Sequence, residues 1–269
     1  MNFTNMIWQG LMQNIMDNGQ TVNPRGKETK ELLGCKTVIP MDYPVITVAN
    51  RKLGYKFMAA EAAWILSGDN RVETIAPYAK AIKDFSDDGV YFFGAYGPPI
   101  RDQISHAINS LVEDQDTRQA VITIWRQNPR KSKDIPCTMS CQFMLREGKL
   151  HCFMNMRSSD VWLGVPYDWF NFSALSAYIA LHLRDRGVKC QLGNLHFYAA
   201  SQHMYAANYE AAKTCMDSPI VCNYEPIILA QFEEPEDLVK HLWMCASNMA
   251  DFCNANWLKE IFVDEDTQA

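Results

Sequence analysis

The chain of 269 residues lacks several features that would assign it to other classes of protein. It contains no run approaching the roughly 20 apolar residues of a membrane-spanning helix, so the sequence predicts no membrane partner. It has no excess of positive charge, because the formal net charge is −6; this disfavours a broad nucleic-acid interface but allows a local basic pocket. It also lacks a Gly-rich phosphate loop of the usual spacing, so any phosphate must be bound by a few arginines.

The nine cysteines lack the regular spacing of a disulfide framework. No basic N-terminal stretch followed by an apolar core indicates a secretory signal, so free thiols in a reducing cytoplasm are expected. A metal site formed by Cys137, Cys141, His151 and Cys152 is disfavoured, because these residues show neither Cys-x-x-Cys nor a paired-histidine spacing. No metal is therefore predicted.

The sequence does contain a mixture of helical and strand-like patterns. Helices are predicted over 3–18, 55–66, 100–112, 170–183, 201–216 and 238–258, and strand-rich pieces over 37–39, 45–48, 120–125, 139–145, 150–156 and 190–198. A turn at Glu147-Gly148 is expected to join two of these strands. Adjacent strand pairs with separated helices favour an α+β fold, with a mixed β-sheet and flanking helices, in a single domain over 1–269.

Several residues are typical of an active site. Cys137 follows a proline and is a candidate nucleophile, although most free cysteines are simply buried small side chains. A thiol of ordinary pKa needs a nearby cation or base to react, and Arg157 is a candidate for that role. Glu61 lies inside an apolar helical run, where a carboxyl group is expected to have a raised pKa suited to acid and base catalysis. The sequence therefore indicates an enzyme.

From about Arg25 to Tyr198, ordered motifs resemble the thymidylate synthase superfamily, and within it the deoxycytidylate hydroxymethylase branch. The matching residues are Pro136-Cys137, Gln142-Phe143, Gly148-Lys149-Leu150, Arg157-Ser158, Asp160, Leu163-Gly164-Val165-Pro166 and His196-Phe197-Tyr198. The resemblance implies that the Cys137 thiolate adds to C6 of a pyrimidine nucleotide, whose C5 then attacks the one-carbon unit of 5,10-methylenetetrahydrofolate. It also implies that Glu61 manages protons through ordered water, and that the protein is a sheet-mediated homodimer.

The resemblance further implies which residues bind the nucleotide. The phosphate is expected at Arg25, Arg157, Ser158 and Arg118, the last reaching in from the other subunit. Gln119 stands where the family usually has a second arginine, so we expect a weaker anion site or one that borrows a charge from Arg126, Arg130 or Lys131. His196 and Tyr198 are expected to bind the 3′-hydroxyl, Ser158 to favour deoxyribose, and Tyr96 to contact the substrate.

On the folate side, the resemblance assigns Asp160 to the pterin ring and Arg51, with Lys52, to the glutamate tail. The remaining residues expected there are Lys83, Leu163, Gly164 and Tyr167.

Asp168 stands where the uracil-using members of the family have asparagine. An amide can donate to O4 and accept from N3–H of uracil. A carboxyl group can accept from N4–H of cytosine and, when protonated, donate to N3. Cytosine is therefore the expected base, and the alternative role for Asp168 is a cap on the helix that begins near Trp169.

The final step implied by the resemblance converts an exocyclic methylene at C5. Lys83 stands where the synthases have a tryptophan, and the acidic tail 262–269 lacks their ending, so a polar pocket is expected to admit water and favour a hydroxymethyl product. The leading prediction is dCMP 5-hydroxymethylation. The alternatives are a dCMP methylase that produces dihydrofolate, a dUMP-specific synthase or dUMP hydroxymethylase, and an inactive nucleotide-binding relative. The branch also implies modified-base synthesis by a bacteriophage in host cytoplasm.

Overall fold

The computed structural model describes residues 3–219, 224–247 and 249. Its helices are α1 (Phe3–Asn18), α2 (Tyr55–Leu66), α3 (Val72–Ile75), α4 (Gly97–Glu113), α5 (Val165–Asp185), α6 (Tyr209–Met216) and α7 (Pro235–Ala246). Its strands are β1 (Gln20–Val22), β2 (Thr29–Pro40), β3 (Val121–Thr123), β4 (Thr138–Arg146), β5 (Lys149–Met156), β6 (Ser159–Asp160) and β7 (Gln191–Tyr205). Four 3-10 turns are η1 (Pro24–Gly26), η2 (Lys80–Phe85), η3 (Ala206–Asn208) and η4 (Leu229–Gln231).

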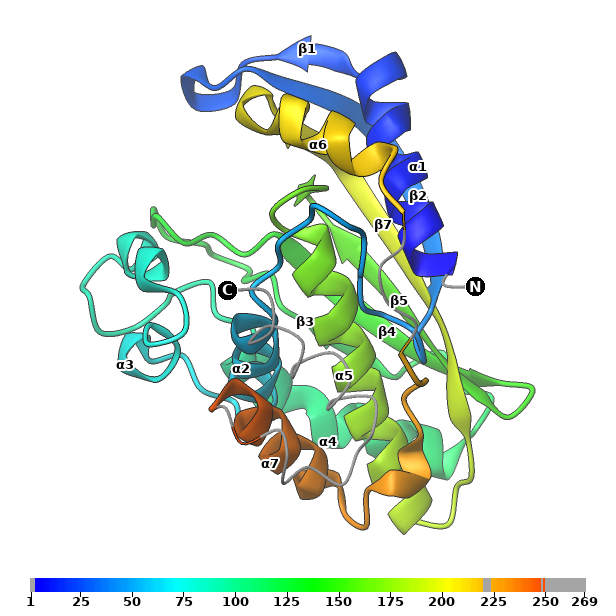
Figure 1. Ribbon diagram of the computed structural model, residues 1–269. Coiled ribbons are helices and arrows are strands. Elements are labelled where there is room, and N and C mark those ends of the chain that lie inside the picture. Colours follow the sequence, from blue (N-terminus) through cyan, green and yellow to red (C-terminus); the bar gives the residue numbers. More distant parts are fainter. Residues whose placement is uncertain (1–2, 220–223, 248, 250–269) are drawn as a thin grey trace.

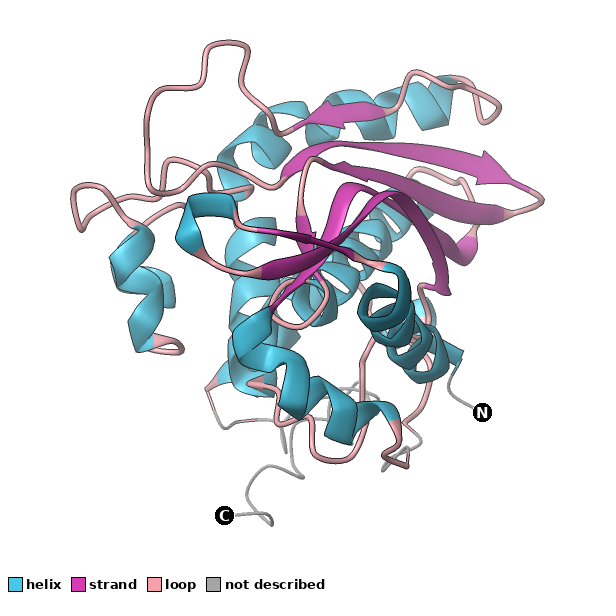
Figure 2. Cartoon of the chain, turned by 90° about the horizontal axis from the view of Figure 1, so that it is seen from above, coloured by secondary structure: helices cyan, strands magenta, loops and turns pink. Residues whose placement is uncertain are grey.

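The strands form one mixed sheet in the order β1-β2-β7-β5-β4-β3, with β6 added beside β7. Strands β5 and β6 run parallel to β7, whereas the other neighbouring pairs are antiparallel. Helices α2, α4, α5 and α7 lie on one side of β4, β5 and β7 (Figure 1), and the view from above shows the strands as a twisted layer (Figure 2). The predicted α+β fold, with a mixed sheet and flanking helices, is confirmed.

The β4–β5 hairpin has the turn that the sequence predicts. Glu147 and Gly148 both have positive φ values, 52° and 70°, the left-handed conformation that two-residue hairpin turns require. From this turn the strands pair as far as Thr138 and Met156. The hairpin therefore ends with Cys137 and Arg157 beside each other.

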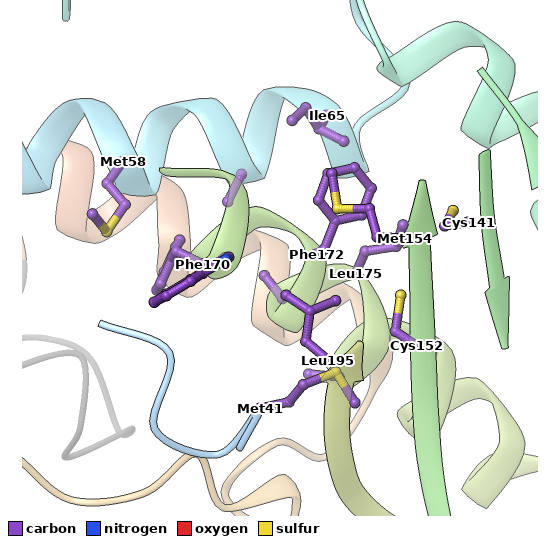
Figure 3. Packing of buried hydrophobic residues seen from close by; sticks show 14 of the residues in the cluster. Met41, Met58, Ile65, Cys141, Cys152, Met154, Phe170, Phe172, Leu175 and Leu195 are labelled. Carbon is purple, nitrogen blue, oxygen red and sulfur yellow. The ribbon is translucent and has the colours of Figure 1, made fainter. Parts of the chain in front are cut away.

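The core lies between the sheet and the helices that cover it. Met58 and Ile65 of α2 pack in the same apolar layer as Phe172 of α5 and Cys152 and Met154 of β5 (Figure 3). Helix α2 is apolar around most of its circumference because seven of its twelve residues are buried. None of the helices in the described part of the chain is long and apolar enough to cross a membrane.

Two predicted elements are wrong in part. Residues 45–48 form buried coil rather than a strand: the Val45 N–H donates to the Tyr224 hydroxyl at 2.6 Å and the Thr47 N–H donates to Asn5 Oδ1 at 2.8 Å. Side chains thus accept the hydrogen bonds of backbone N–H groups that a neighbouring strand would accept in a sheet.

The predicted helix 201–216 begins only at Tyr209, because Ser201–Tyr205 continues β7 and pairs with β2. Tertiary pairing overrides the local helical pattern there. The predicted helix 238–258 is described only as α7, and residues 250–269, with the acidic tail, lie outside the described part.

Candidate active site

Cys137 and Arg157 meet at the open end of the β4–β5 hairpin. Arg157 Nη2 lies 3.8 Å from Cys137 Sγ. The guanidinium is held in place by two carbonyl groups, with Nε donating to Pro136 O at 2.9 Å and Nη2 donating to Ile135 O at 3.0 Å. A fixed cation therefore lies beside the thiol.

The charge environment of Cys137 is more mixed than the sequence suggests. Burial raises the pKa of the thiol above its ordinary value; Arg157 lowers it, Asp168 and Asp134 raise it, and Arg25 lowers it. Without a ligand, the thiol form is thus favoured in spite of the adjacent guanidinium. Thiolate formation must be coupled to substrate binding or to proton transfer within the site.

A cavity of about 190 Å3 adjoins this centre. Its polar wall contains Glu61, Tyr96, Asp134, Asp168 and Asn171, and its apolar wall contains Trp64, Ile65, Ile82, Phe85 and Phe92. Cys137 does not line the cavity, but Tyr96, which does, accepts a hydrogen bond from the N–H of Thr138, the residue directly after Cys137, so the cavity lies beside this part of the chain. A partly apolar hollow with convergent polar groups is typical of a small-molecule site.

Glu61 of α2 is held by Asn171 of α5 across the cavity wall. The Asn171 amide Nδ2 donates to Glu61 Oε2 at 2.7 Å. Burial raises the pKa of Glu61 to about 7, and the hydrogen bond from Asn171 opposes that shift. Glu61 is therefore poised to gain or lose a proton near neutral pH, as the sequence predicts for this position.

Asp168 lies in the first turn of α5, one helical turn before Asn171. Burial raises its pKa well above the ordinary value, and the negative charges of Glu61 and Asp160 raise it further. Its neutral form is thus favoured far more strongly than that of an ordinary aspartate. Tyr96 adds a phenolic hydroxyl to this wall, where its Oη accepts a hydrogen bond from the Thr138 N–H at 3.3 Å.

A second group of residues surrounds Asp160 at the end of β6. Its Oδ1 accepts hydrogen bonds from the N–H groups of Trp162 (2.8 Å) and Leu163 (3.1 Å). Oδ2 is buried and has no partner in the described part of the chain. Arg51 stacks on the Trp162 ring at 4.3 Å and donates to the Trp162 carbonyl at 2.8 Å. A buried open acceptor beside an aromatic–guanidinium stack suits a planar ligand with an N–H group.

The other residues predicted to bind folate do not all lie beside Asp160. Gly164 precedes α5, and its N–H donates to the Asp160 carbonyl at 2.9 Å. The Tyr167 hydroxyl accepts from the Gly54 N–H at 3.2 Å, while Leu163 is 56% exposed. Lys83 is exposed on η2, and it is Ile82 and Phe85 of the same turn that line the cavity.

The predicted phosphate ligands divide into two sets. Arg157, Ser158 and Arg25 belong to the first: Ser158 directly follows Arg157, and Arg25 is close enough to lower the pKa of Cys137. Arg25 also has the left-handed φ of 55°, a strained conformation for a non-glycine residue that is often found at functional sites.

Arg118 belongs to the second set, because it lies beside the middle of β4. Its carbonyl accepts from Gln142 Nε2 at 2.6 Å. Gln142 is five residues beyond Cys137 on this strand, a separation of roughly 16 Å. An arginine side chain is too short to span that distance, so Arg118 is remote from the Cys137 of its own chain.

His196 and Tyr198 lie on the same face of β7. The His196 ring stacks on Phe153 at 4.3 Å and lies 5.6 Å from the His151 ring. Its Nδ1 is buried and has no partner among the described residues, and burial lowers the pKa of the imidazole. A neutral imidazole with an open nitrogen remains available to a hydroxyl group.

Sequence reasoning missed two polar residues of the cavity, Asn171 and Asp134. The spacing of Asn171 from Asp168 is a signal that could have found it, because residues three apart share one face of a helix. Asp134 lies in a loop whose course the sequence does not indicate. Among the described residues, no group of three or more His, Cys, Asp or Glu side chains is placed to hold a metal ion.

Comparison with known proteins agrees with this fold and site. Residues 6–223 match the family model described as Thymidylate synthase, and the chain belongs to that family of one-carbon transferases. The family uses 5,10-methylenetetrahydrofolate as cosubstrate and a pyrimidine nucleotide as acceptor.

Two similar proteins come from bacteriophages. The Deoxyuridylate hydroxymethyltransferase of Bacillus phage SP01 is 30% identical over 233 residues, which cover 77% of this chain and 58% of the relative. The Deoxyuridylate hydroxymethyltransferase of Pseudomonas phage M6 is 32% identical over 171 residues, which cover 60% of this chain and 47% of the relative. The chain thus spans about half the length of these curated relatives.

Proposed function

We propose that the protein hydroxymethylates C5 of dCMP, converting dCMP, 5,10-methylenetetrahydrofolate and water into 5-hydroxymethyl-dCMP and tetrahydrofolate. The observation that carries the choice of base is the buried carboxyl group of Asp168 at the cavity, where the uracil-using members of the family have an amide. The names of the phage relatives support the hydroxymethyl product. We also propose one catalytic domain over 1–269, and phage relatives support a role in host cytoplasm.

In the proposed mechanism, Cys137 adds to C6 of the base while Arg157 stabilises the thiolate. Arg157, Ser158 and Arg25 bind the phosphate through guanidinium and hydroxyl donors. The neutral carboxyl group of Asp168 donates to cytosine N3 and accepts from N4–H. As negative charge develops on the ring after thiolate addition, the proton of Asp168 can move onto N3 and neutralise it. Glu61, with a pKa of about 7, exchanges protons with the water near C5.

Folate is assigned to the Asp160 side of the site. The buried, unpaired Oδ2 of Asp160 fits an N–H group of the pterin ring, and the Arg51–Trp162 stack offers a flat surface beside it. Gly164 and Tyr167 adjoin this region through Asp160 and Gly54, while Leu163 presents an exposed apolar side chain. Lys83 is exposed on the same turn as Ile82 and Phe85, which line the cavity, and we assign it there as a polar residue that helps to admit water, while Arg51 and Lys52 are assigned to the glutamate tail.

A sheet-mediated homodimer completes the phosphate site. Arg118 is too far from its own Cys137 to share a ligand with it, which supports a role in the partner's site. The sheet presents partly exposed apolar side chains, Val38 (37%), Met139 (42%) and Tyr198 (42%), that a second copy could cover. His196 and Tyr198 are assigned to the 3′-hydroxyl, and Tyr96 to the base side of the pocket.

Hydroxymethylation of dUMP is the second candidate, and the names of both phage relatives favour it. A neutral carboxyl group has one donor and one acceptor, as an amide does, so a protonated Asp168 also matches O4 and N3–H of uracil. The ionised form suits neither base fully, because a carboxylate accepts one N–H but repels O4 of uracil or N3 of cytosine. Which oxygen of the neutral Asp168 carries the proton therefore decides which base the site prefers.

The test is a direct comparison of the two nucleotides. The purified protein is incubated with dCMP or dUMP and excess 5,10-methylenetetrahydrofolate, and products are identified by mass spectrometry, with dihydrofolate followed by absorbance. We expect 5-hydroxymethyl-dCMP without dihydrofolate. A methylated product with dihydrofolate would assign a methylase, preference for dUMP would assign the second candidate, and binding without turnover would indicate an inactive relative.

A further inference from the structure

Asp134 is a carboxyl group of the cavity that the mechanism above does not use. It lies three residues before Cys137 and lines the cavity together with the apolar side chains Ile82, Phe85 and Phe92. Its Oδ2 accepts a hydrogen bond from the Gly94 N–H at 2.7 Å. Within the described part of the chain, its other oxygen, Oδ1, has no hydrogen-bond donor. One oxygen thus fixes the carboxyl group, and the other is open to a ligand.

The chain makes room for this carboxyl group at Gly94. A Cβ atom added at Gly94 would lie 2.7 Å from Asp134 O and 2.8 Å from Asp134 Oδ1, distances that no side chain could tolerate. The loop that contains Asp134 is held to the loop around Asp87 by hydrogen bonds that do not involve the Asp134 side chain. The Asp87 carboxylate accepts from Ser132 Oγ at 2.6 Å and from the Lys133 N–H at 2.9 Å. Asp87 thus ties the two loops together outside the cavity, and Asp134 is not needed for that contact.

Asp134 is also better suited to act as an anion than the other two carboxyl groups. Glu61 is deeply enclosed and bound by Asn171, and the negative charges of its neighbours disfavour ionisation of Asp168. Burial and the negative charge of Asp87 raise the pKa of Asp134, and the Gly94 N–H and the positive charge of Arg126 oppose that rise, so the net shift is upward but less marked than that of Asp168. A group that takes a proton must first be ionised.

We propose that Asp134 is the base that takes a proton from the water attacking the C5 methylene carbon. This inference rests on the proposed hydroxymethylase function. The water oxygen forms a bond to the methylene carbon, the electrons of the exocyclic double bond move onto the ring, and the proton passes to Asp134. The ring electrons then re-form the C5–C6 double bond and expel Cys137 as thiolate, and Asp134 releases its proton to solvent. Asp134 therefore directs the intermediate towards the hydroxymethyl product.

Two variants separate this role from a structural one. Asp134→Asn keeps an acceptor for the Gly94 N–H but cannot take a proton, whereas Asp134→Leu makes this wall of the cavity apolar. Asp87→Asn is the matched control, because it removes a carboxylate that does not line the cavity from the same loop contact, and loss of its charge lowers the pKa of Asp134 and so keeps that group ionised. Each protein is mixed in excess with nucleotide tritiated at C5 and 5,10-methylenetetrahydrofolate for a single turnover. Tritium release reports loss of the C5 proton, and mass spectrometry reports hydroxymethyl and methyl products.

In Asp134→Asn we expect hydroxymethyl formation to slow by about 100-fold while tritium release stays within a few-fold of wild type. Asp134→Leu should behave similarly and increase the methyl share, and Asp87→Asn should resemble wild type. The inference is overturned if hydroxymethyl formation is unchanged in both Asp134 variants, or falls in step with tritium release. If the wild-type protein forms no hydroxymethyl nucleotide, the proposed function fails as well, so the two failures are distinguishable.

Discussion

Replacing Asp168 with asparagine is expected to shift the substrate preference from dCMP towards dUMP. The amide can donate to O4 and accept from N3–H of uracil, and in that orientation it leaves N3 and N4–H of cytosine without suitable partners, whereas a carboxylic acid can shift its proton between its two oxygens to suit cytosine. An unsatisfied buried group costs about 1–3 kcal/mol, so the ratio of kcat/KM for dCMP to that for dUMP should fall by roughly 5- to 150-fold. The measurement is kcat/KM for both nucleotides with folate in excess.

The pH dependence of kcat/KM provides an internal check. Burial and the negative charges of Glu61 and Asp160 raise the pKa of Asp168 well above its ordinary value. The neutral acid can pair with either base, whereas the carboxylate repels N3 of cytosine and O4 of uracil alike. In the wild type, kcat/KM for both nucleotides should therefore fall as Asp168 ionises at high pH, and in Asp168→Asn that part of the fall should be absent.

The control is Asp102→Asn, which makes the same chemical change at an exposed ion pair with Arg101 on α4. It should leave both kcat/KM values unchanged. If the wild type prefers dUMP at every pH, or if Asp168→Asn leaves the ratio as it was, Asp168 acts only as a residue of the first helical turn and the assignment of cytosine is wrong.

Three further predictions concern the rest of the site. Cys137→Ser should abolish turnover and retain nucleotide binding, measured by calorimetry, since a hydroxyl is a far weaker nucleophile; more than trace activity would remove Cys137 from the mechanism. Mixing inactive Cys137→Ser and Arg118→Ala chains should restore activity, because one site of the heterodimer is then intact, whereas no recovery after verified subunit exchange would refute a shared site. Glu61 has a raised pKa of about 7, so the folded protein binds its proton more tightly than the unfolded chain, and the free energy of unfolding should fall between about pH 4.5 and 7. Glu61→Gln should remove that decrease, at most roughly 3 kcal/mol, and identical pH profiles of thermal unfolding would contradict the assigned burial.

The sequence predicts those parts of the site that depend on local structure. The hairpin 139–156 follows from two apolar runs separated by Glu147-Gly148, and its closure brings Cys137 next to Arg157. The apolar pattern of 55–66 likewise predicts α2 with the correct bounds, and with it the position of Glu61 among buried apolar neighbours. In both cases residues within a single element or hairpin decide the geometry.

The sequence does not predict contacts that depend on long-range packing. Asp134 enters the cavity because the loop before β4 lies against Gly94, forty residues earlier, and no periodic pattern indicates such a contact. Similarly, Ser201–Tyr205 extends β7 because β2 is available to pair with it, although the local pattern is helical. The neutral state of Asp168 also arises only in the folded chain, where Glu61 and Asp160 come close to it.

The three carboxyl groups near Cys137 pose an electrostatic problem that their protonation can solve. Each anion near the thiol makes thiolate formation less favourable, and binding of a phosphate would neutralise the Arg157 and Arg25 charges that oppose this effect. Because Glu61 and Asp168 have raised pKa values, they carry less negative charge than ordinary carboxyl groups would at the same pH. Because burial favours their protonated forms, these two carboxyl groups can donate protons to the base and to the water near it. Clustering carboxyl groups around the nucleophile is therefore compatible with covalent catalysis because most of these groups remain protonated until the reaction requires their protons.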